Sequence, residues 1–85
     1  MIFKPKIKIY STPICHFCDM VKQYMKDKGF EFTDIDVSLD EKALYEMQAK
    51  TGQLGVPVIE IEKNGEKKLI IGFDKVNIDE ILEIK

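Results

Sequence analysis

The chain lacks several features that define large classes of proteins. Its 85 residues include 13 basic and 15 acidic side chains, for a net charge of −2, so it has no basic excess of the kind that nucleic-acid binding requires. No apolar run is long enough to span a membrane. The first six residues alternate charged and apolar side chains instead of forming the apolar core of a signal peptide. We therefore expect a cytoplasmic protein that acts on a small molecule or on another protein.

Cysteine and histidine are also scarce. Both cysteines and the only histidine lie in the segment Cys15-His16-Phe17-Cys18. A structural zinc site normally needs four protein ligands, and His16 lies between the cysteines, where it cannot easily reach the same centre. In a reducing compartment, two cysteines are not expected to form a permanent structural disulfide bond. The pair is therefore either redox-active or part of a metal or iron–sulfur site that a second subunit or outside thiols complete.

The length and composition predict a single domain over residues 1–85, because 45% of the residues are hydrophobic and no repeat, linker or low-complexity segment divides the chain. Hydrophobic periodicity predicts the element order β-α-β-α-β-β-α. The strands are expected at 7–10, 30–37, 58–62 and 67–71, with the first strand extending back as far as Ile2 in its longest form. The helices are expected from Cys15 to Gly29, from Ser38 to Gly52, and from Asn77 to Leu82.

Capping and turn residues mark the boundaries of these elements. Ser38 and Glu41 have the spacing of a capping box, in which a hydroxyl and a carboxylate satisfy free backbone donors at the start of a helix. Asn77 is expected to cap the last helix. The dipeptide Asn64-Gly65 favours a type I′ turn, because both residues tolerate positive φ, and it predicts a hairpin between the third and fourth strands.

The second strand has an irregular pattern. Its apolar residues change parity between Phe32 and Ile35, which predicts either a bulge or a strand that is buried on both faces. Tyr10, Phe30 and Phe32 are expected in the core together with the methionines. Residues of the charged runs 63–68 and 79–80 are expected to be solvated and to have no specific function.

The position of Cys15 at the start of a predicted helix indicates a nucleophile. A cysteine attacks a disulfide as a thiolate, so a working nucleophile needs a pKa below the free value of about 8.5. Unpaired backbone N–H groups and the helix dipole favour the thiolate there. Cys18 is expected to be more buried and to act as the resolving thiol, which attacks Cys15 in a mixed disulfide. His16 either adds to the activation when protonated or is simply an exposed loop side chain.

Two distant segments add to this signal. Pro57 directly precedes a strand, and a cis Val56–Pro57 bond would turn the chain sharply and leave the backbone groups of Val56 free to bind an extended substrate. An ordinary proline at the start of a strand is the alternative. Gly72-Phe73-Asp74 places a flexible backbone and one carboxylate between a strand and the last helix.

Together these motifs resemble those of a glutaredoxin, or of a closely related glutaredoxin-like redoxin, and the likeness covers nearly the whole chain. The resemblance implies an α/β protein with a thioredoxin fold, in which a four-stranded mixed sheet of order 2-1-3-4 is flanked by helices and the sulfur of Cys15 lies beside a cis Pro57. The motifs that carry it are Cys15-His16-Phe17-Cys18, Thr51-Gly52-Gln53 followed by Val56-Pro57, and Gly72-Phe73-Asp74.

The resemblance also implies a groove that binds glutathione or a substrate peptide. In the family, the backbone at the position of Val56 pairs with the cysteine of the bound thiol, and the positions of Gln53 and Asp74 help to hold the ends of glutathione. Phe17 occupies the place of a common tyrosine. The residues expected to form the groove beside Cys15 and Cys18 are Thr12, Pro13, His16, Phe17, Gln53, Val56, Pro57, Gly72, Phe73 and Asp74.

Three departures from the family pattern concern the electron donor. Thr12 stands where many glutaredoxins have a lysine for the glutathione carboxylate, Gly55 replaces a usual threonine, and Ile71-Gly72 replaces a glycine pair. They leave open whether glutathione or a thioredoxin-reductase-type enzyme reduces the protein. In either case the resemblance implies a monomeric dithiol–disulfide oxidoreductase without a bound cofactor or metal, whose partners are disulfide-containing proteins and a reductant.

A soft-metal carrier is the alternative from another class, because a CxxC motif after a first strand can bind copper(I) through two thiolates. That class commonly has the order βαββαβ, and the Val56–Pro57 segment has no role in it. The helix predicted between the second strand and the hairpin favours the redoxin.

Overall fold

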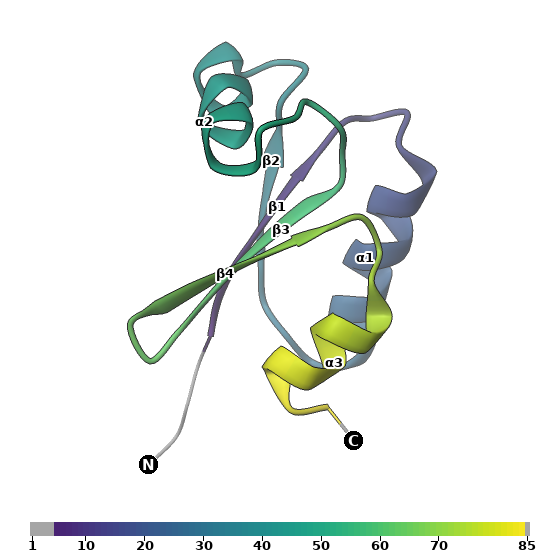
Figure 1. Cartoon of the computed structure of the whole chain (residues 1–85). Helices are drawn as coiled ribbons and strands as arrows, with labels where there is room; N and C mark the ends of the chain where they lie inside the picture. The colour runs from purple at the N-terminus through teal and green to yellow at the C-terminus, as the bar shows by residue number, and fades with distance from the viewer. Residues whose placement is uncertain (1–4, 85) are drawn as a thin grey trace.

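The computed structural model describes residues 5–84, which form strands and helices in the predicted order (Figure 1). The elements in chain order are β1 (Lys6–Ser11), α1 (His16–Asp27), β2 (Thr33–Asp36), α2 (Glu41–Thr51), β3 (Val58–Lys63), β4 (Glu66–Ile71) and α3 (Lys75–Leu82). The first strand begins at Lys6, and the earlier start considered at Ile2 lies outside the described residues. Within the described range, no helix has the length and apolar character that crossing a membrane requires.

The strands form one mixed sheet in the order β2-β1-β3-β4, as predicted. β1 is parallel to β2 and antiparallel to β3, and β3 is antiparallel to β4. Asn64 and Gly65 both have positive φ, as the predicted type I′ turn requires. Because Tyr10 pairs with Val58 and Val58 pairs with Ile71, the end of β1, the start of β3 and the end of β4 lie at the same edge of the sheet.

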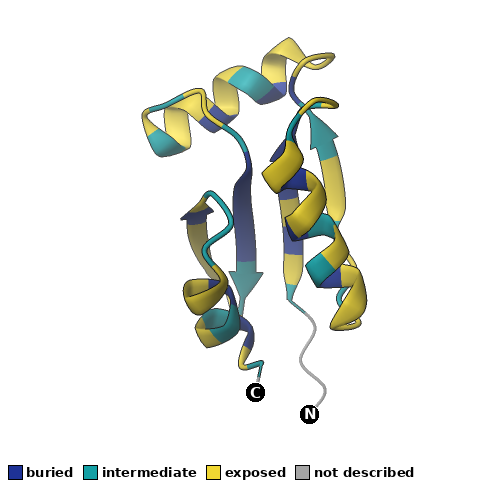
Figure 2. Ribbon diagram, turned by 90° about the vertical axis from the view of Figure 1, so that its right-hand side faces the viewer, coloured by how far each residue is buried: buried dark blue, intermediate teal, exposed yellow. Residues whose placement is uncertain are grey.

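Each face of the sheet carries its own hydrophobic cluster, because successive side chains on a strand point to opposite faces. Figure 2 shows the buried residues concentrated in the central strands and on the inner sides of the helices. The cluster that packs α1 and α3 against one face contains Ile7, Ile9, Val21, Met25, Ile59, Ile61, Ile70, Ile78 and Leu82. The cluster that packs α2 against the other face contains Tyr10, Val37, Ala43, Met47 and Val58.

The second strand is shorter than predicted. It spans Thr33–Asp36 and pairs with β1 residue by residue, so the bulge is absent, and Thr33 and Asp34 are exposed, so the alternative of a strand buried on both faces is also wrong. Phe30 and Phe32 precede it in a connecting segment and pack against the first cluster. The parity slip in the sequence therefore marks the boundary between a connecting segment and strand β2.

Two helices begin at residues other than those predicted. Asp40 caps α2, since its carboxylate accepts a hydrogen bond from the Ala43 amide at 3.0 Å, whereas Ser38 donates to Asp36 in the preceding turn. Asp74 caps α3 in the same way, with the Asn77 amide as donor at 3.3 Å. Asn77 is therefore inside the helix that it was expected to cap.

Candidate redox site

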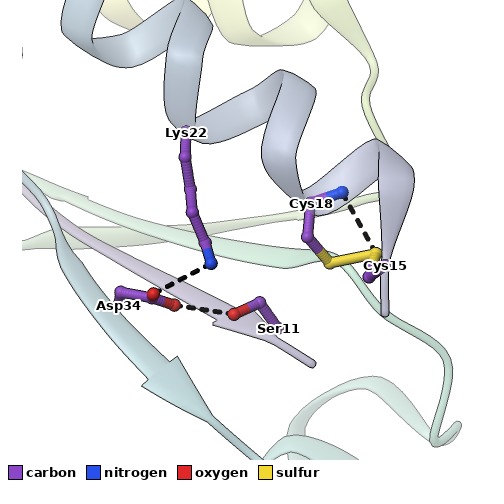
Figure 3. The surroundings of a disulfide bond; sticks show 5 residues. All are labelled: Ser11, Cys15, Cys18, Lys22 and Asp34. Atoms are coloured by element: carbon purple, nitrogen blue, oxygen red, sulfur yellow. Dashed lines mark hydrogen bonds and ion pairs between the residues drawn. A yellow bond between two sulfur atoms is a disulfide. The ribbon is translucent and has the colours of Figure 1, made fainter. Parts of the chain in front are cut away.

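Cys15 and Cys18 form a disulfide at the start of α1, with 5.2 Å between their Cα atoms (Figure 3). Cys15 is the N-cap residue of the helix, and its sulfur accepts a hydrogen bond from the backbone amide of Cys18 at 3.0 Å. This sulfur thus occupies the place that a serine or aspartate oxygen takes at most helix starts. An amide donor and the positive end of the helix dipole both favour negative charge on it.

The two sulfurs differ in their access to solvent. Cys15 is half-buried, whereas Cys18 is fully buried, with no exposed surface. An incoming disulfide can therefore reach Cys15 but not Cys18, which agrees with the nucleophile and the resolving thiol expected from the sequence.

The loop before the helix presents an open surface around Cys15. The Cys15 amide donates to the Thr12 carbonyl at 3.2 Å, which closes a turn over Pro13 and Ile14. Pro13 is exposed and Thr12 is half-buried. His16 and Phe17 are both exposed at the first turn of α1, and their rings lie 6.1 Å apart in an edge-to-face arrangement.

The segments at Pro57 and Gly72 lie side by side next to this loop. The Val56–Pro57 peptide bond is cis, and Pro57 is buried immediately before β3. The Gly72 amide donates to the Pro57 carbonyl at 2.8 Å. Since β1, β3 and β4 all meet at this edge of the sheet, the three segments singled out in the sequence converge there.

The remaining groove residues predicted from the sequence have structural contacts of their own. Phe73 is half-buried and packs against Tyr24, with 5.7 Å between ring centroids. Val56 is half-buried and packs against the second cluster. Gln53 is half-buried, and its backbone amide donates to the Thr51 hydroxyl at 3.2 Å.

Asp74 has both carboxylate oxygens engaged within the chain. One accepts from the Asn77 amide at 3.3 Å and the other from the Asn77 side-chain amide at 2.7 Å. A ligand that uses Asp74 therefore has to share the carboxylate with the start of α3.

Comparison with known proteins identifies the family. A family model described as Glutaredoxin matches residues 7–66. The chain belongs to the glutaredoxin family. It is 46% identical over 77 residues to a glutaredoxin-like 8.6 kDa protein from the rubredoxin operon of Clostridium pasteurianum, an alignment that covers 91% of this chain and 97% of that protein.

Two further relatives are more distant. This glutaredoxin is 36% identical over 75 residues to N-acetyl-S-hydroxy-L-cysteine reductase of Bacillus subtilis, over 88% of this chain and 77% of the relative. Its structure matches that of the glutaredoxin-like protein NrdH-redoxin from Escherichia coli with a TM-score of 0.69 and 27% identity, over 86% of this chain and 92% of that chain. The described residues contain no group of three or more His, Cys, Asp or Glu side chains that could hold a metal ion.

A polar trio that the sequence did not predict lies near the disulfide and is formed by Ser11, Lys22 and Asp34 (Figure 3). The Ser11 hydroxyl donates to one oxygen of Asp34 at 2.6 Å, and the Lys22 ammonium lies 2.8 Å from the other. The available sequence signal was the position of Lys22, four residues after Cys18 and thus on the same side of the helix.

The pKa of Asp34 reflects these contacts. Partial burial raises it, but hydrogen bonds from Lys22 and Ser11 and the charges of Lys22 and Lys26 outweigh that effect, so the pKa lies below its ordinary value of 3.8. Asp34 therefore stays ionised at neutral pH and keeps Lys22 beside the strand.

Proposed function

We propose that this glutaredoxin is a dithiol–disulfide oxidoreductase in which Cys15 is the nucleophile and Cys18 the resolving thiol. The Cys15 thiolate attacks a substrate disulfide, forms a mixed disulfide with one substrate sulfur and releases the other as a thiolate. The Cys18 thiolate then attacks the Cys15 sulfur and displaces the second substrate thiolate. The substrate gains two electrons and the chain becomes the Cys15–Cys18 disulfide. The observation that carries the proposal is the N-cap position of an accessible Cys15 bonded to a buried Cys18.

The substrate groove is proposed to run between the Cys15 loop and the Pro57 segment. Val56 supplies backbone groups for an extended thiol-containing chain, and Phe17, 59% exposed, supplies an apolar wall. On the side of the groove formed by the start of α1, the proposed binding residues are Thr12, Pro13 and His16. The other proposed binding residues are Gln53, Pro57, Gly72, Phe73 and Asp74.

Between the two electron donors, we favour a thioredoxin-reductase-type enzyme over glutathione. Thr12 cannot supply the positive charge that a glutathione carboxylate needs. Asp74 is already engaged at the start of α3. The NrdH-redoxin structure, 27% identical, is described as explaining a thioredoxin-like activity profile in a glutaredoxin-like protein, which supports the same choice.

The donor can be identified by a direct comparison. We expect the oxidised protein to be reduced faster by NADPH with a thioredoxin reductase than by NADPH with glutathione and glutathione reductase. A Thr12→Lys variant should gain rate with glutathione only. Equal or faster reduction of the unaltered chain by glutathione would reverse the assignment.

A second candidate substrate is a small cysteine sulfenic acid, which the 36% identical reductase of N-acetyl-S-hydroxy-L-cysteine supports. The same two thiols can perform this reaction. The Cys15 thiolate attacks the sulfenic sulfur and releases hydroxide, which takes a proton to become water, and Cys18 then resolves the mixed disulfide as before. The test is oxidation of the reduced protein by N-acetyl-S-hydroxy-L-cysteine, followed as loss of its two thiols.

Replacing each cysteine in turn tests the assignment of roles. Cys15→Ser should abolish disulfide reduction, because the remaining thiol is buried. Cys18→Ser should form a stable mixed disulfide and keep activity only on substrates whose reduction passes through one cysteine. The measurement is turnover of a protein disulfide, with intact-mass analysis of the mixed disulfide.

Two outcomes would count against the proposal. Undiminished dithiol activity in Cys15→Ser would exclude Cys15 as the nucleophile. Stoichiometric metal in the reduced protein, measured by native mass spectrometry, would favour the soft-metal carrier, in which two thiolates bind copper(I).

A further inference from the structure

Cys18 has a proton to lose before it can resolve a mixed disulfide, yet it is completely buried. Burial in an apolar environment disfavours the thiolate, so the second step of the proposed reaction is the one that needs help from a neighbouring charge. The amide and the dipole at the start of α1 act on Cys15, which takes part as the sulfur under attack. A further positive group near Cys18 would favour this second thiolate.

Lys22 is the positive group placed to do this. It follows Cys18 by four residues on α1, so the two side chains are neighbours on one side of the helix, with Cβ atoms about 6 Å apart. Its side chain is only 20% exposed, which is low for a lysine, and Figure 3 shows it running from α1 toward Asp34 on the neighbouring strand. A charge held in such a partly desolvated place acts more strongly than one in open water.

Asp34 and Ser11 fix the position of this ammonium. Asp34 lies on β2, 2.8 Å from the Lys22 nitrogen, and Ser11 is a buried residue at the end of β1 that donates to Asp34 at 2.6 Å. Two neighbouring strands thus hold the charge of Lys22 in place. The carboxylate opposes part of that charge, so the two partners of this ion pair act on Cys18 with opposite signs.

Other ionisable groups near Cys18 are more exposed. On α1 these are His16, Asp19 and Lys26, which are all exposed, whereas the Lys22 side chain is only 20% exposed and pairs with Asp34 on β2.

We propose that Lys22 is a positioning residue for the resolving step, which stabilises the thiolate of Cys18 from a site fixed by Asp34 and Ser11. This inference rests on the proposed function, because it assigns a helper to its second step. Cys18 releases its proton to solvent, its thiolate attacks the Cys15 sulfur, and the substrate thiolate leaves with the electron pair of the broken bond.

A titration isolates Cys18 from the reaction. In a Cys15→Ser background, Cys18 is the only thiol of the chain, so the ultraviolet absorbance of the thiolate reports it alone. Adding Lys22→Gln should move the midpoint of this titration up by about half a pH unit or more, and adding Asp34→Asn should move it down. Lys42→Gln, the same charge change at an exposed position on α2, should leave it unchanged.

The two substitutions are expected to shift the titration midpoint in opposite directions, and this separates an electrostatic role from a structural one. Both substitutions break the same ion pair, so a purely structural role predicts shifts in the same direction. Shifts of the same sign, or a Lys22→Gln midpoint equal to that of Lys42→Gln, would overturn the proposal.

Kinetics with dithiobis(nitrobenzoate) separate the two steps in the chain that retains both cysteines. The first coloured thiolate is released when Cys15 attacks, and the second when Cys18 resolves the mixed disulfide. Lys22→Gln should leave the first release unchanged and slow the second about threefold, because half a pH unit corresponds to an about threefold lower thiolate fraction.

The kinetics distinguish a failure of the proposed function from a failure of the role assigned to Lys22. If Cys15→Ser does not abolish the first release, the proposed function itself is wrong. If the first release depends on Cys15 but the second is equally fast in Lys22→Gln and Lys42→Gln, only the role of Lys22 is wrong.

Discussion

Cys15 caps helix α1 through its sulfur, the same atom that we propose to attack the substrate disulfide. In the oxidised chain its sulfur accepts a hydrogen bond from the Cys18 amide. Upon reduction the acceptor becomes a thiolate, and hydrogen bonds to charged acceptors are stronger than those to neutral ones. The cap therefore strengthens when Cys15 becomes reactive, which couples the stability of the first turn of α1 to the redox state.

Asp34 gives a prediction about pH. Its pKa is lowered in the folded chain, so protons bind it more weakly there than in the unfolded chain. Its contacts therefore stabilise the folded chain at pH values above 3.8, the ordinary pKa of the group. This stabilisation is lost as the pH falls through the lower pKa that Asp34 has in the folded chain. Asp34→Asn should lower the free energy of unfolding at pH 7 by at most about 1 kcal/mol, because the side chain is nearly half exposed.

Urea unfolding at several pH values checks this. The difference between the unaltered chain and Asp34→Asn should be present at neutral pH and shrink in acid. Glu31→Gln, which removes an exposed carboxylate, is the matched control for the loss of one negative charge. A difference that stays constant into acid would show that ionisation of Asp34 does not contribute.

At the element scale, capping aspartates set where two helices begin. Asp40 starts α2 and Asp74 starts α3, and each carboxylate accepts the amide of the residue three positions later. The start of α3 also fixes the segment beside Pro57, since Gly72, two residues before Asp74, donates to the Pro57 carbonyl.

Substitutions at Asp74 separate its capping role from ligand binding. Asp74→Ala should lower the free energy of unfolding by about 1 kcal/mol, whereas Asp74→Ser should keep most of the cap. If Asp74 also binds the charged end of glutathione, both variants should lose affinity equally. Chemical denaturation and a glutathione titration measure the two effects, and equal stability of the Ala and Ser variants would contradict the capping role.

Element order could be predicted from hydrophobic periodicity and from turn and capping residues within short segments, whereas the sheet order followed only from the resemblance to glutaredoxins. The helix starts could not be predicted, because Ser38 and Asp40, or Asp74 and Asn77, are all good caps and the choice depends on the preceding turn. The contact between Ser11 and Asp34 could not be predicted from the sequence either, because it joins residues 23 positions apart that are brought together only by the pairing of two strands.

At the scale of the whole molecule, the sheet separates two cores of different size (Figures 1 and 2). The smaller cluster, under α2, is supplemented by a partly buried ion pair in which only the carboxylate is buried. Glu60 on β3 has a side chain only 5% exposed, and Lys50 near the end of α2 lies 2.9 Å from one of its oxygens. Lys50 also donates to the Tyr10 hydroxyl at 3.2 Å, so a single side chain joins α2 to two strands.

Lys50→Met tests this connection. The hydrogen bond from Lys50 is the main support of the Glu60 carboxylate, because the nearest other cation, Lys8, is 3.8 Å away. Its loss should lower the free energy of unfolding by about 1–3 kcal/mol. The double variant Lys50→Met with Glu60→Leu should recover much of that loss, because an apolar pair needs no partner. Urea unfolding at pH 7 measures both, and a Lys50→Met variant as stable as Lys42→Met would contradict the connection.

The chain contains two cysteines and both belong to the same disulfide. Its oxidation state is therefore a single two-electron variable that can be counted on the intact protein. Alkylation after rapid acid quenching adds two tags to the reduced chain and none to the oxidised chain. A chain that carries one tag together with the mass of a thiol compound is the mixed disulfide, and the mass of that adduct names the substrate or reductant captured at Cys15.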